Sequence, residues 1–316
     1  MTQWLLVDEA PASGARTMAV DELLLRRVEN DGGAPVLRLY SFSPPAITLG
    51  YHQDVSKAID IDAAAADGLD VVRRITGGRA LLHDGELTYS VTAPVGPPFG
   101  NGLAETFLFI AGVIVSALRS VGIEAQLGSA KHAGLESRMS SPCLVSTSRH
   151  EITAGGRKIS GSAQRRTGGA FIQHGSILLR AGSERIEKFL HGGWKGLAGM
   201  ITTVEAETGD AGKDRELRNL VIDLFGSAMG EKPGDLGTPV VSDRIGRPDV
   251  HEAHAALQPL QVRMKPGQRR QAPQPGRMPG KERPVLLHHL DHERTRPVRF
   301  VLVTAVGLLQ PPAFPQ

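Results

Sequence analysis

The chain has 316 residues, of which 41% are hydrophobic, with 36 lysines and arginines against 33 acidic residues and a single cysteine. This length is sufficient for one large domain or two ordinary ones with a buried core. One cysteine excludes a disulfide framework, a zinc site built from several cysteines and an iron–sulfur cluster.

The sequence predicts neither a membrane span nor a secretory signal. The longest apolar run, residues 107–118, is interrupted by Gly112 and Ser116 and is shorter than the roughly 20 residues of a spanning helix. The first ten residues, MTQWLLVDEA, lack a basic segment followed by an apolar one. We therefore expect a soluble, cytoplasmic protein that does not bind membranes.

Charge and proline content divide the chain near residue 229. Residues 1–230 carry 23 basic and 25 acidic side chains, a net charge of −2, whereas residues 231–316 carry 13 and 8, a net charge of +5. Of the 21 prolines, 8 precede residue 231 and 13 follow it. We expect a globular domain over residues 1–229 and a basic, Pro/Gly-rich extension of unknown role over 230–316, whose composition disfavours a packed core.

Hydrophobic periodicity in the first 230 residues predicts helices mixed with strands. Thr17 can cap a helix that ends at Asn30, before two glycines, and residues 104–121 have the clearest helical pattern. The other predicted elements, in chain order, are strands over 36–40 and 46–49, a helix over 61–66, a buried strand over 70–73, strands over 86–92 and 125–127, a hairpin of 149–153 with 158–164, a strand over 170–179, and helices over 184–190 and 214–228. This order predicts an α+β fold with a mixed or antiparallel sheet flanked by helices.

One candidate site segment is residues 73–90, RRITGGRALLHDGELTYS. Gly77 and Gly78 would let the backbone approach a ligand closely and present N–H groups to an oxyanion or phosphate. The segment is not a P-loop, because no Lys-Ser or Lys-Thr pair follows the glycines. A hairpin turn explains the glycine pair equally well, and His83 could be a structural hydrogen-bonding residue.

A second candidate segment is residues 157–176, RKISGSAQRRTGGAFIQHGS. Strand alternation predicts that Lys158, Ser160 and Ser162 share one face, which small neighbours keep open. Lys158 could then hold a carbonyl or phosphate oxygen as a point charge, or it could be an ordinary exposed lysine.

The single cysteine, Cys143, lies in the sequence SSPCLVS. A lone cysteine is commonly a small buried hydrophobe, but this one follows Pro142 and precedes a basic hairpin. An electropositive neighbour would lower the pKa of its thiol. A dedicated metal site is not expected, because no two histidines before residue 231 are spaced i, i+4; these histidines are His52, His83, His132, His150, His174 and His191.

Taken together, these segments resemble the biotin/lipoate protein ligase catalytic-domain superfamily. The resemblance runs from Leu5 to about Leu179 and on toward Ala228. It is carried by the early helix with Met18, Asp21 and Glu22, by Arg38, by LGYHQ at residues 49–53, by RRITGGR, and by KISGSAQRR followed by QHGSILL.

Two chemistries occur within that superfamily. Lipoate–protein ligases such as lipoate–protein ligase A activate lipoate with ATP, whereas octanoyltransferases take octanoate from octanoyl-acyl carrier protein without ATP. The ligase pattern has a third glycine where this chain has Arg79, followed by ALLHDGELTYS. This version is similar to the LipM-type octanoyltransferases.

The resemblance implies that Cys143 is the nucleophile and Lys158 a second catalytic residue, with Leu144 standing where the family usually has an aromatic residue. Cys143 would accept octanoate as a thioester and pass it to a lysine of a lipoyl domain, in 2-oxoacid dehydrogenases or glycine cleavage H protein. Lys158 would lower the pKa of Cys143 and stabilise the oxyanion. The implied acyl- and substrate-binding residues are Arg73, Arg74, Gly77, Gly78, Arg79, His83, Gly161, Ser162, Gln173, His174 and Gly175.

Three other functions remain open from the sequence. An ATP-dependent lipoate–protein ligase would use the same scaffold, and ATP enters only in that case, since the transferase needs no cofactor. A lipoyl amidotransferase would use Cys143 with an acylated protein as donor. A protein without enzymatic activity could bind nucleic acid through the basic extension, although that extension contains just two aromatic residues.

Overall fold

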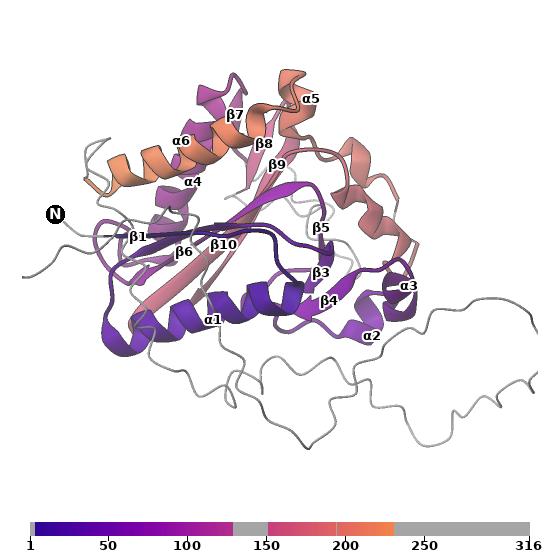
Figure 1. Cartoon of the computed structure of the whole chain (residues 1–316), viewed down its shortest axis with the longest axis horizontal. Coiled ribbons are helices and arrows are strands. Elements are labelled where there is room, and N and C mark those ends of the chain that lie inside the picture. Colours follow the sequence, from indigo (N-terminus) through magenta and orange to yellow (C-terminus); the bar gives the residue numbers. More distant parts are fainter. Residues whose placement is uncertain (1–3, 129–150, 194, 231–316) are drawn as a thin grey trace, which may run out of the picture. The chain divides into compact units, whose positions relative to one another are not determined.

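Two sheets organise the part of the chain that the computed structural model describes, which is residues 4–128, 151–193 and 195–230. The larger sheet has the strand order β1-β2-β6-β10-β9-β8-β7, and the smaller one has the order β4-β3-β5 (Figure 1). The strands are β1 (Leu5–Asp8), β2 (Val36–Tyr40), β3 (Ala46–Leu49), β4 (Asp70–Arg73), β5 (Leu81–His83), β6 (Glu86–Pro94), β7 (Ala125–Leu127), β8 (Ile152–Ala154), β9 (Arg157–Arg166) and β10 (Ala170–Leu178). Cys143 and residues 231–316 lie outside the described residues.

Helices cover both faces of the larger sheet. The helix α1 lies against one face, and α4 and α6 lie against the other (Figure 1). The helical elements are α1 (Gly14–Asp31), α2 (Val55–Ala58), α3 (Ile61–Ala66), α4 (Leu103–Ser120), α5 (Val204–Thr208) and α6 (Lys213–Ala228), with 3₁₀ turns η3 (Ser183–Lys188) and η4 (Leu197–Gly199). Because β1 pairs with β2 and β3 with β4 in parallel while the other pairs are antiparallel, the predicted α+β fold with a mixed sheet is confirmed.

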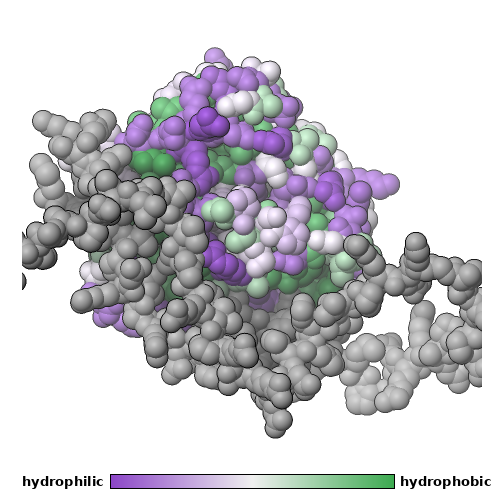
Figure 2. Space-filling model, in the orientation of Figure 1, coloured by the Kyte–Doolittle hydropathy of each residue, from purple (hydrophilic) through white to green (hydrophobic). Residues whose placement is uncertain are grey.

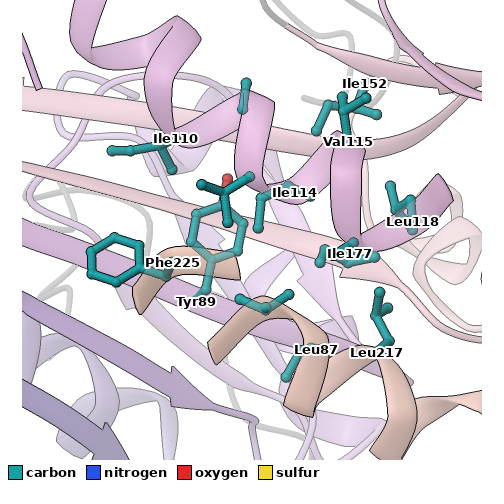
Figure 3. Packing of buried hydrophobic residues seen from close by; sticks show 14 of the residues in the cluster. Leu87, Tyr89, Ile110, Ile114, Val115, Leu118, Ile152, Ile177, Leu217 and Phe225 are labelled. Carbon is teal, nitrogen blue, oxygen red and sulfur yellow. The ribbon is translucent and has the colours of Figure 1, made fainter. Parts of the chain in front are cut away.

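Strand alternation in β6 gives the sheet one apolar and one polar face. Leu87, Tyr89 and Val91 belong to the large apolar cluster, whereas the alternating Thr88 and Ser90 face polar partners beneath α1. Figure 3 shows the apolar side, where side chains of α4 and α6 meet those of β6 and β10. Burying one large aliphatic side chain in this way contributes roughly 1.5–3 kcal/mol. The polar face is therefore the one left for chemistry.

The most apolar helix, α4, belongs to this core. It is 18 residues long with a mean hydropathy of 1.6, so length and composition alone would allow a membrane span, contrary to the sequence-based argument. Half of that stretch is buried within the protein, and Ile110, Ile114 and Leu118 pack into the apolar cluster (Figure 3). The visible surface of the described residues is mostly hydrophilic, with scattered apolar areas (Figure 2). These features are those of a core helix.

The boundaries of α1 differ from the prediction at one end. The helix begins four residues earlier than expected, because Ser13 is the N-cap in place of Thr17: its hydroxyl accepts a hydrogen bond from the amide N–H of Arg16. Thr17 is a buried residue inside the helix and does not cap it. The other end follows the prediction, with Gly32 in the left-handed conformation as C-cap.

The glycine pair between β4 and β5 does not form a hairpin turn. Both strands flank β3, so the segment that joins them must cross the end of β3. Four short elements were not predicted from the sequence: β1, β5, α2 and α5. Each is at most five residues long and lacks a full period of any pattern. The strand β4 is half-buried, not buried as expected, and the predicted helix at 184–190 is the 3₁₀ turn η3.

Candidate active site

Arg74 organises the glycine segment from inside. Its guanidinium donates to the carbonyl of Gly77 at 2.9 Å and of Arg79 at 2.8 Å, and to the carbonyl and hydroxyl of Thr48 at 3.0 Å each. The side chain is buried. Arg74 therefore ties the segment to the end of β3, which fixes where the backbone of the two glycines lies.

Arg73 holds the loop that follows β3 in place through hydrogen bonds to its backbone. Its Nη1 donates to the carbonyl oxygens of Gly50, Tyr51 and Gln53 at 2.7 to 3.0 Å. The two loops also touch directly, because a Cβ on Gly50 would lie 1.9 Å from the carbonyl oxygen of Gly78. Glycine is thus required at residue 50, and Gly78 itself has a positive φ of 96°.

Lys158 is a buried residue, with 1% of its surface exposed, so the interpretation as an ordinary exposed lysine is wrong. Its Nζ donates to Glu151 Oε1 at 2.5 Å, and both side chains of this ion pair are buried. The stem of the side chain runs over Gly161, where a Cβ would lie 2.8 Å from Lys158 Cε. Glycine at 161 therefore makes the room that the lysine occupies.

A register shift in the β8–β9 hairpin explains why Lys158 reaches the polar face. Ile152 pairs with Ser160, but Thr153 pairs with Lys158, so one extra residue of β9 is accommodated there. Ser160 pairs with Ile152 on one neighbouring strand and with Ile177 on the other, and both isoleucines belong to the apolar cluster. Paired residues lie on the same face of a sheet, so Ser160 lies on the apolar face. The expectation that Lys158 and Ser160 share one face is therefore wrong.

His174 joins a buried charge network beneath α1. Its Nδ1 contacts Asp21 Oδ2 at 2.9 Å, and its Nε2 contacts Thr76 Oγ1 at 2.6 Å. Burial lowers the pKa of His174, and the interaction with Asp21 offsets only part of that effect. We infer a neutral imidazole that donates from Nδ1 to Asp21 and accepts from Thr76.

Asp21 is the centre of this network. It also accepts from Arg38 Nη1 at 2.7 Å, from the Tyr40 hydroxyl at 3.0 Å and from the Ser90 hydroxyl at 2.9 Å. Burial by itself raises the pKa of Asp21, but Arg38 and the hydrogen bond with His174 outweigh it and lower the pKa below its ordinary value. Burial raises the pKa of Tyr40 well above 10. Asp21 is therefore a paired, ionised carboxylate that holds its neighbours in place.

His83 has a corresponding acidic partner at the other end of the polar face. Its Nδ1 is hydrogen-bonded to Glu86 Oε1, and its Nε2 contacts Thr48 Oγ1 at 2.8 Å. The ring also stacks on Phe42, with 4.1 Å between the ring centroids. Glu86 Oε1 accepts further hydrogen bonds from the hydroxyls of Thr88 and Ser176.

These elements surround one pocket. Of the residues proposed from sequence, the pocket wall contains Arg74, His83, Lys158, Gly161, Ser162, His174 and Gly175. Five other predicted residues do not line this pocket in the described part of the chain: Arg73, Gly77, Gly78, Arg79 and Gln173. The first four of these form or hold the glycine segment, and Gln173 is fully buried in β10, where it pairs with Val91 of the apolar side.

Several residues of the pocket were not predicted from the sequence. The remaining wall residues are Met18, Tyr40, Thr48, Leu81, Thr88, Ala163 and Ser176. Three acidic residues do not line this pocket but are hydrogen-bonded to wall residues: Asp21, Glu86 and Glu151. The position of Glu86, three residues after His83, was a usable signal for that pair. No comparable signal links Glu151 to Lys158, since the two meet across a hairpin with shifted register.

The pocket combines an apolar lining with one ammonium group. Met18, Leu81 and Ala163 supply aliphatic surface, and the cationic residues in the wall are Arg74 and Lys158. The pocket has a volume of about 40 Å³, which is room for one or two water molecules, so its walls must separate before an acyl chain can enter. Within the described ranges, no group of three or more His, Cys, Asp or Glu side chains could hold a metal ion.

The chain is similar in sequence to octanoyltransferases. It is 42% identical over 177 residues to octanoyltransferase LipM of Moorella thermoacetica, which covers 56% of this chain and 65% of that protein. It is 38% identical over 191 residues to octanoyltransferase LipM of Carboxydothermus hydrogenoformans, which covers 60% and 70%. The chain thus spans slightly less than two thirds of the Moorella protein.

Solved structures of ligases share the fold. The crystal structure of lipoate-protein ligase A bound with ATP matches with a TM-score of 0.62 at 24% identity, over 73% of this chain and 87% of that one. A bi-partite lipoate protein ligase from Thermoplasma acidophilum matches with a TM-score of 0.59 at 22% identity, over 73% and 84%. The family model described as the lipoyl protein ligase A/B catalytic domain matches residues 13–225. Since this match includes β2 to β10 and all the described pocket residues, the chain belongs to the lipoyl protein ligase A/B catalytic-domain family.

Proposed function

We propose that this protein is an octanoyltransferase that moves octanoate from octanoyl-acyl carrier protein to a lysine of a lipoyl domain, through a thioester on Cys143. The observation that carries the proposal is the identity of 42% and 38% to two proteins named octanoyltransferase LipM. The chemistry of the pocket agrees with the proposal, because aliphatic side chains and a buried lysine meet there, and its walls must separate to admit an eight-carbon chain. Each methylene transferred from water into such a lining contributes about 0.8 kcal/mol.

The proposed reaction has two half-reactions. In the first, the Cys143 thiolate attacks the octanoyl carbonyl, the tetrahedral intermediate collapses, and the carrier thiolate leaves. In the second, the ε-amine of the acceptor lysine attacks the enzyme thioester, the Cys143 thiolate leaves, and the nitrogen loses a proton as the amide forms. The first step exchanges one thioester for another, so no nucleotide is needed to drive it.

Lys158 supplies a fixed donor for the oxyanion in both half-reactions. Glu151 holds Nζ in the pocket wall through the 2.5 Å ion pair, which gives the preorganised geometry that oxyanion stabilisation requires. The same ion pair lowers the positive field that Lys158 exerts on surrounding groups. We therefore assign Lys158 mainly to the oxyanion, and only secondarily to activation of the Cys143 thiol. One such donor is worth roughly 3 kcal/mol.

The test mixes the protein with octanoyl-acyl carrier protein and apo lipoyl domain in the absence of ATP and follows the intact mass of each protein. We expect octanoylated lipoyl domain with the full chain and none with Cys143→Ala. Lys158→Ala should slow formation of the octanoyl-enzyme more than tenfold, whereas Lys57→Ala, at an exposed lysine, should leave the rate unchanged. An unchanged rate in Lys158→Ala would remove this lysine from the mechanism.

The same assay separates the alternatives. Transfer that requires ATP and lipoate, and survives Cys143→Ala, would identify a lipoate–protein ligase. Transfer from a lipoylated protein in preference to octanoyl-acyl carrier protein would identify an amidotransferase. Inactivity with all these donors, combined with salt-dependent DNA or RNA binding, would favour the nucleic-acid function of the extension.

A further inference from the structure

Four adjacent strands of the larger sheet contribute one row of residues to the floor of the pocket. Gly161 of β9 pairs with Ser176 of β10, and Ser176 pairs in turn with Thr88 of β6. Thr88 pairs with Tyr40 of β2, and all four residues line the pocket (Figure 1). Neighbouring strands are about 4.8 Å apart, so the row crosses the sheet in steps of that length.

The floor presents mainly carbon to the pocket, although three of its four residues carry hydroxyl groups. The hydroxyls of Thr88 and Ser176 donate to Glu86 Oε1 at 2.6 and 3.0 Å. The Tyr40 hydroxyl donates to Asp21 Oδ2 at 3.0 Å. A hydroxyl has a single proton, so each donor is already used by a buried carboxylate. The row therefore suits a hydrocarbon chain.

Lys158 determines the end of the row at which the carbonyl of an acyl group would lie. A Cβ on Gly161 would lie 3.0 Å from Lys158 Nζ, so the ammonium group lies over the β9 end of the row. A carbonyl oxygen that accepts from Nζ lies about 2.9 Å from it. No residue of β8, the next strand of the sheet, lines this pocket in the described part of the chain. The hydrocarbon must therefore extend from β9 toward β2.

The distance from β9 to β6 matches the length of an eight-carbon chain. An extended chain advances about 1.2 Å per bond, so the seven bonds from the carbonyl carbon to the terminal methyl of an octanoyl group span about 8 Å. Two strand spacings measure about 9–10 Å. An octanoyl chain that begins over Gly161 thus ends over Thr88, and the next residue of the row is Tyr40.

Tyr40 is held in place at this far end. Its ring lies 4.0 Å from the guanidinium carbon of Arg38 and 5.9 Å from the ring of Phe42, measured from the centroid. The side chain is fully buried, and Asp21 holds its hydroxyl. A ring with these three neighbours cannot turn out of the path at low cost.

The pocket can widen on the side opposite the floor. The floor strands β6 and β10 are each hydrogen-bonded to two neighbours. The opposite wall includes Thr48, Leu81 and His83 of the smaller sheet, and Met18 of α1 also lines the pocket. A methionine side chain adapts its shape readily. Separation of these walls changes the width of the pocket but not the length of the row.

We propose that Tyr40 is the end wall of the acyl pocket and limits the transferred chain to eight carbons, counted from the carbonyl at Lys158. This inference rests on the proposed function, since it requires an acyl group whose carbonyl meets that lysine. A decanoyl chain would extend about 2.4 Å farther and meet the Tyr40 ring. A hexanoyl chain would leave the space over Thr88 empty.

The test measures kcat/KM of the full chain with hexanoyl-, octanoyl- and decanoyl-acyl carrier protein. We expect the wild type to prefer octanoyl over decanoyl at least tenfold. Tyr40→Leu shortens the end wall, so its decanoyl-to-octanoyl ratio should rise roughly 15-fold, since each newly buried methylene contributes a factor of about four. Tyr40→Phe is the matched control, because it loses the same hydrogen bond to Asp21 but keeps the ring, and it should still prefer eight carbons.

A second variant blocks the row at its middle and decides the question if Tyr40→Leu does not fold. Ser176→Val adds a methyl group between β9 and β6, so the hexanoyl-to-octanoyl ratio should rise at least tenfold. Ser176→Ala loses the same hydrogen bond to Glu86 without the added bulk and should keep the wild-type ratio. An unchanged ratio in Ser176→Val would show that the chain does not follow this row.

Thermal unfolding with free hexanoate, octanoate or decanoate gives a readout that does not depend on transfer. The ligand that binds most tightly raises the unfolding temperature most, which should be octanoate for the wild type and decanoate for Tyr40→Leu. Wild-type chain-length profiles in Tyr40→Leu, or equal relaxation in Tyr40→Phe, would overturn the end wall. The expected order of fatty-acid binding in a wild-type chain that transfers no octanoyl group would contradict the proposed function alone.

Discussion

Asp21 shows how a single buried carboxylate can determine the position of several others. It accepts hydrogen bonds from Arg38, Tyr40, Ser90 and His174, and it is completely buried. Arg38 is equally buried and has Glu9 as its second carboxylate partner. A buried ion pair with these added hydrogen bonds contributes little when intact, but it is costly to break, because a charge is left without compensation.

Asp21→Asn should destabilise the domain by about 3–5 kcal/mol, since it leaves Arg38 with one carboxylate instead of two and removes the anion beside His174. Urea unfolding at pH 7 measures the loss. Glu29→Gln, at an exposed position of the same helix, should change the free energy of unfolding by less than about 0.5 kcal/mol. A loss below about 1 kcal/mol in Asp21→Asn would show that the network relaxes around the amide.

The pH dependence of the same pair of proteins gives a second check on this prediction. The pKa of Asp21 is lowered in the folded protein relative to 3.8, so its stabilising effect is complete above pH 3.8. That effect disappears as the pH falls through the lower folded-state value, because the unfolded chain binds the proton first. The difference between wild type and Asp21→Asn should therefore narrow below about pH 3.8.

At the scale of elements, the sequence predicts what periodicity controls. The strands β2 and β3 and the helix α3 have the predicted bounds, and α4 and α6 are within one residue of them. The two long helices carry an apolar pattern that matches their buried face. The path of the glycine segment across β3 could not be predicted, since it depends on hydrogen bonds from Arg73 and Arg74 to distant carbonyls. A pattern of residue types does not specify such contacts.

The candidate site divides in the same way. Lys158, His83 and His174 follow from motifs that are contiguous in sequence, and all three line the pocket. Their acidic partners were not assigned to the site from the sequence, where Asp21 enters only through the resemblance. Glu151 reaches Lys158 through a register shift, and Asp21 reaches His174 across 153 residues. Motifs thus identify groups that face the ligand, while the groups behind them depend on tertiary packing.

Gly161 of β9 gives a test of how an element determines a side-chain position. In Gly161→Ala the new Cβ would lie 2.8 Å from Lys158 Cε and 3.0 Å from Nζ, so the lysine must move. The lysine end is flexible, so we expect a stability loss of only about 1 kcal/mol. Displacement of Nζ from Glu151 should slow octanoyl-enzyme formation at least tenfold, because oxyanion contacts tolerate little misplacement.

A second glycine supplies the control for that variant. A Cβ on Gly112 of α4 would meet no heavy atom within 4 Å, and alanine favours the helix by about 1 kcal/mol. Gly112→Ala should therefore raise the unfolding temperature without changing the transfer rate. If Gly161→Ala retained the wild-type rate of octanoyl-enzyme formation, the position of Lys158 would not matter to the first half-reaction.

For the molecule as a whole, the question is how much of the chain the proposed chemistry needs. The apolar clusters of the described part are built from residues between Trp4 and Met229, and the family match covers residues 13–225. The residues after 230 contribute a net charge of +5 and 13 of the 21 prolines. The described domain therefore has a core of its own in addition to the described part of the site.

A chain that ends at Gly230 should fold and catalyse like the full one. We expect its unfolding midpoint to lie within about 2 °C of the full-length value, since roughly 4 °C or less corresponds to 1 kcal/mol for a domain of this size. Its kcat/KM for octanoyl transfer should agree with that of the full chain within twofold at two salt concentrations. This comparison tests for electrostatic attraction between the basic extension and the carrier proteins. A tenfold loss that is confined to low salt would assign the extension to carrier binding, and a loss at both salts would make it part of the catalytic unit. Binding of a DNA duplex by the full chain alone would assign the positive charge to nucleic acid, independently of the transfer reaction.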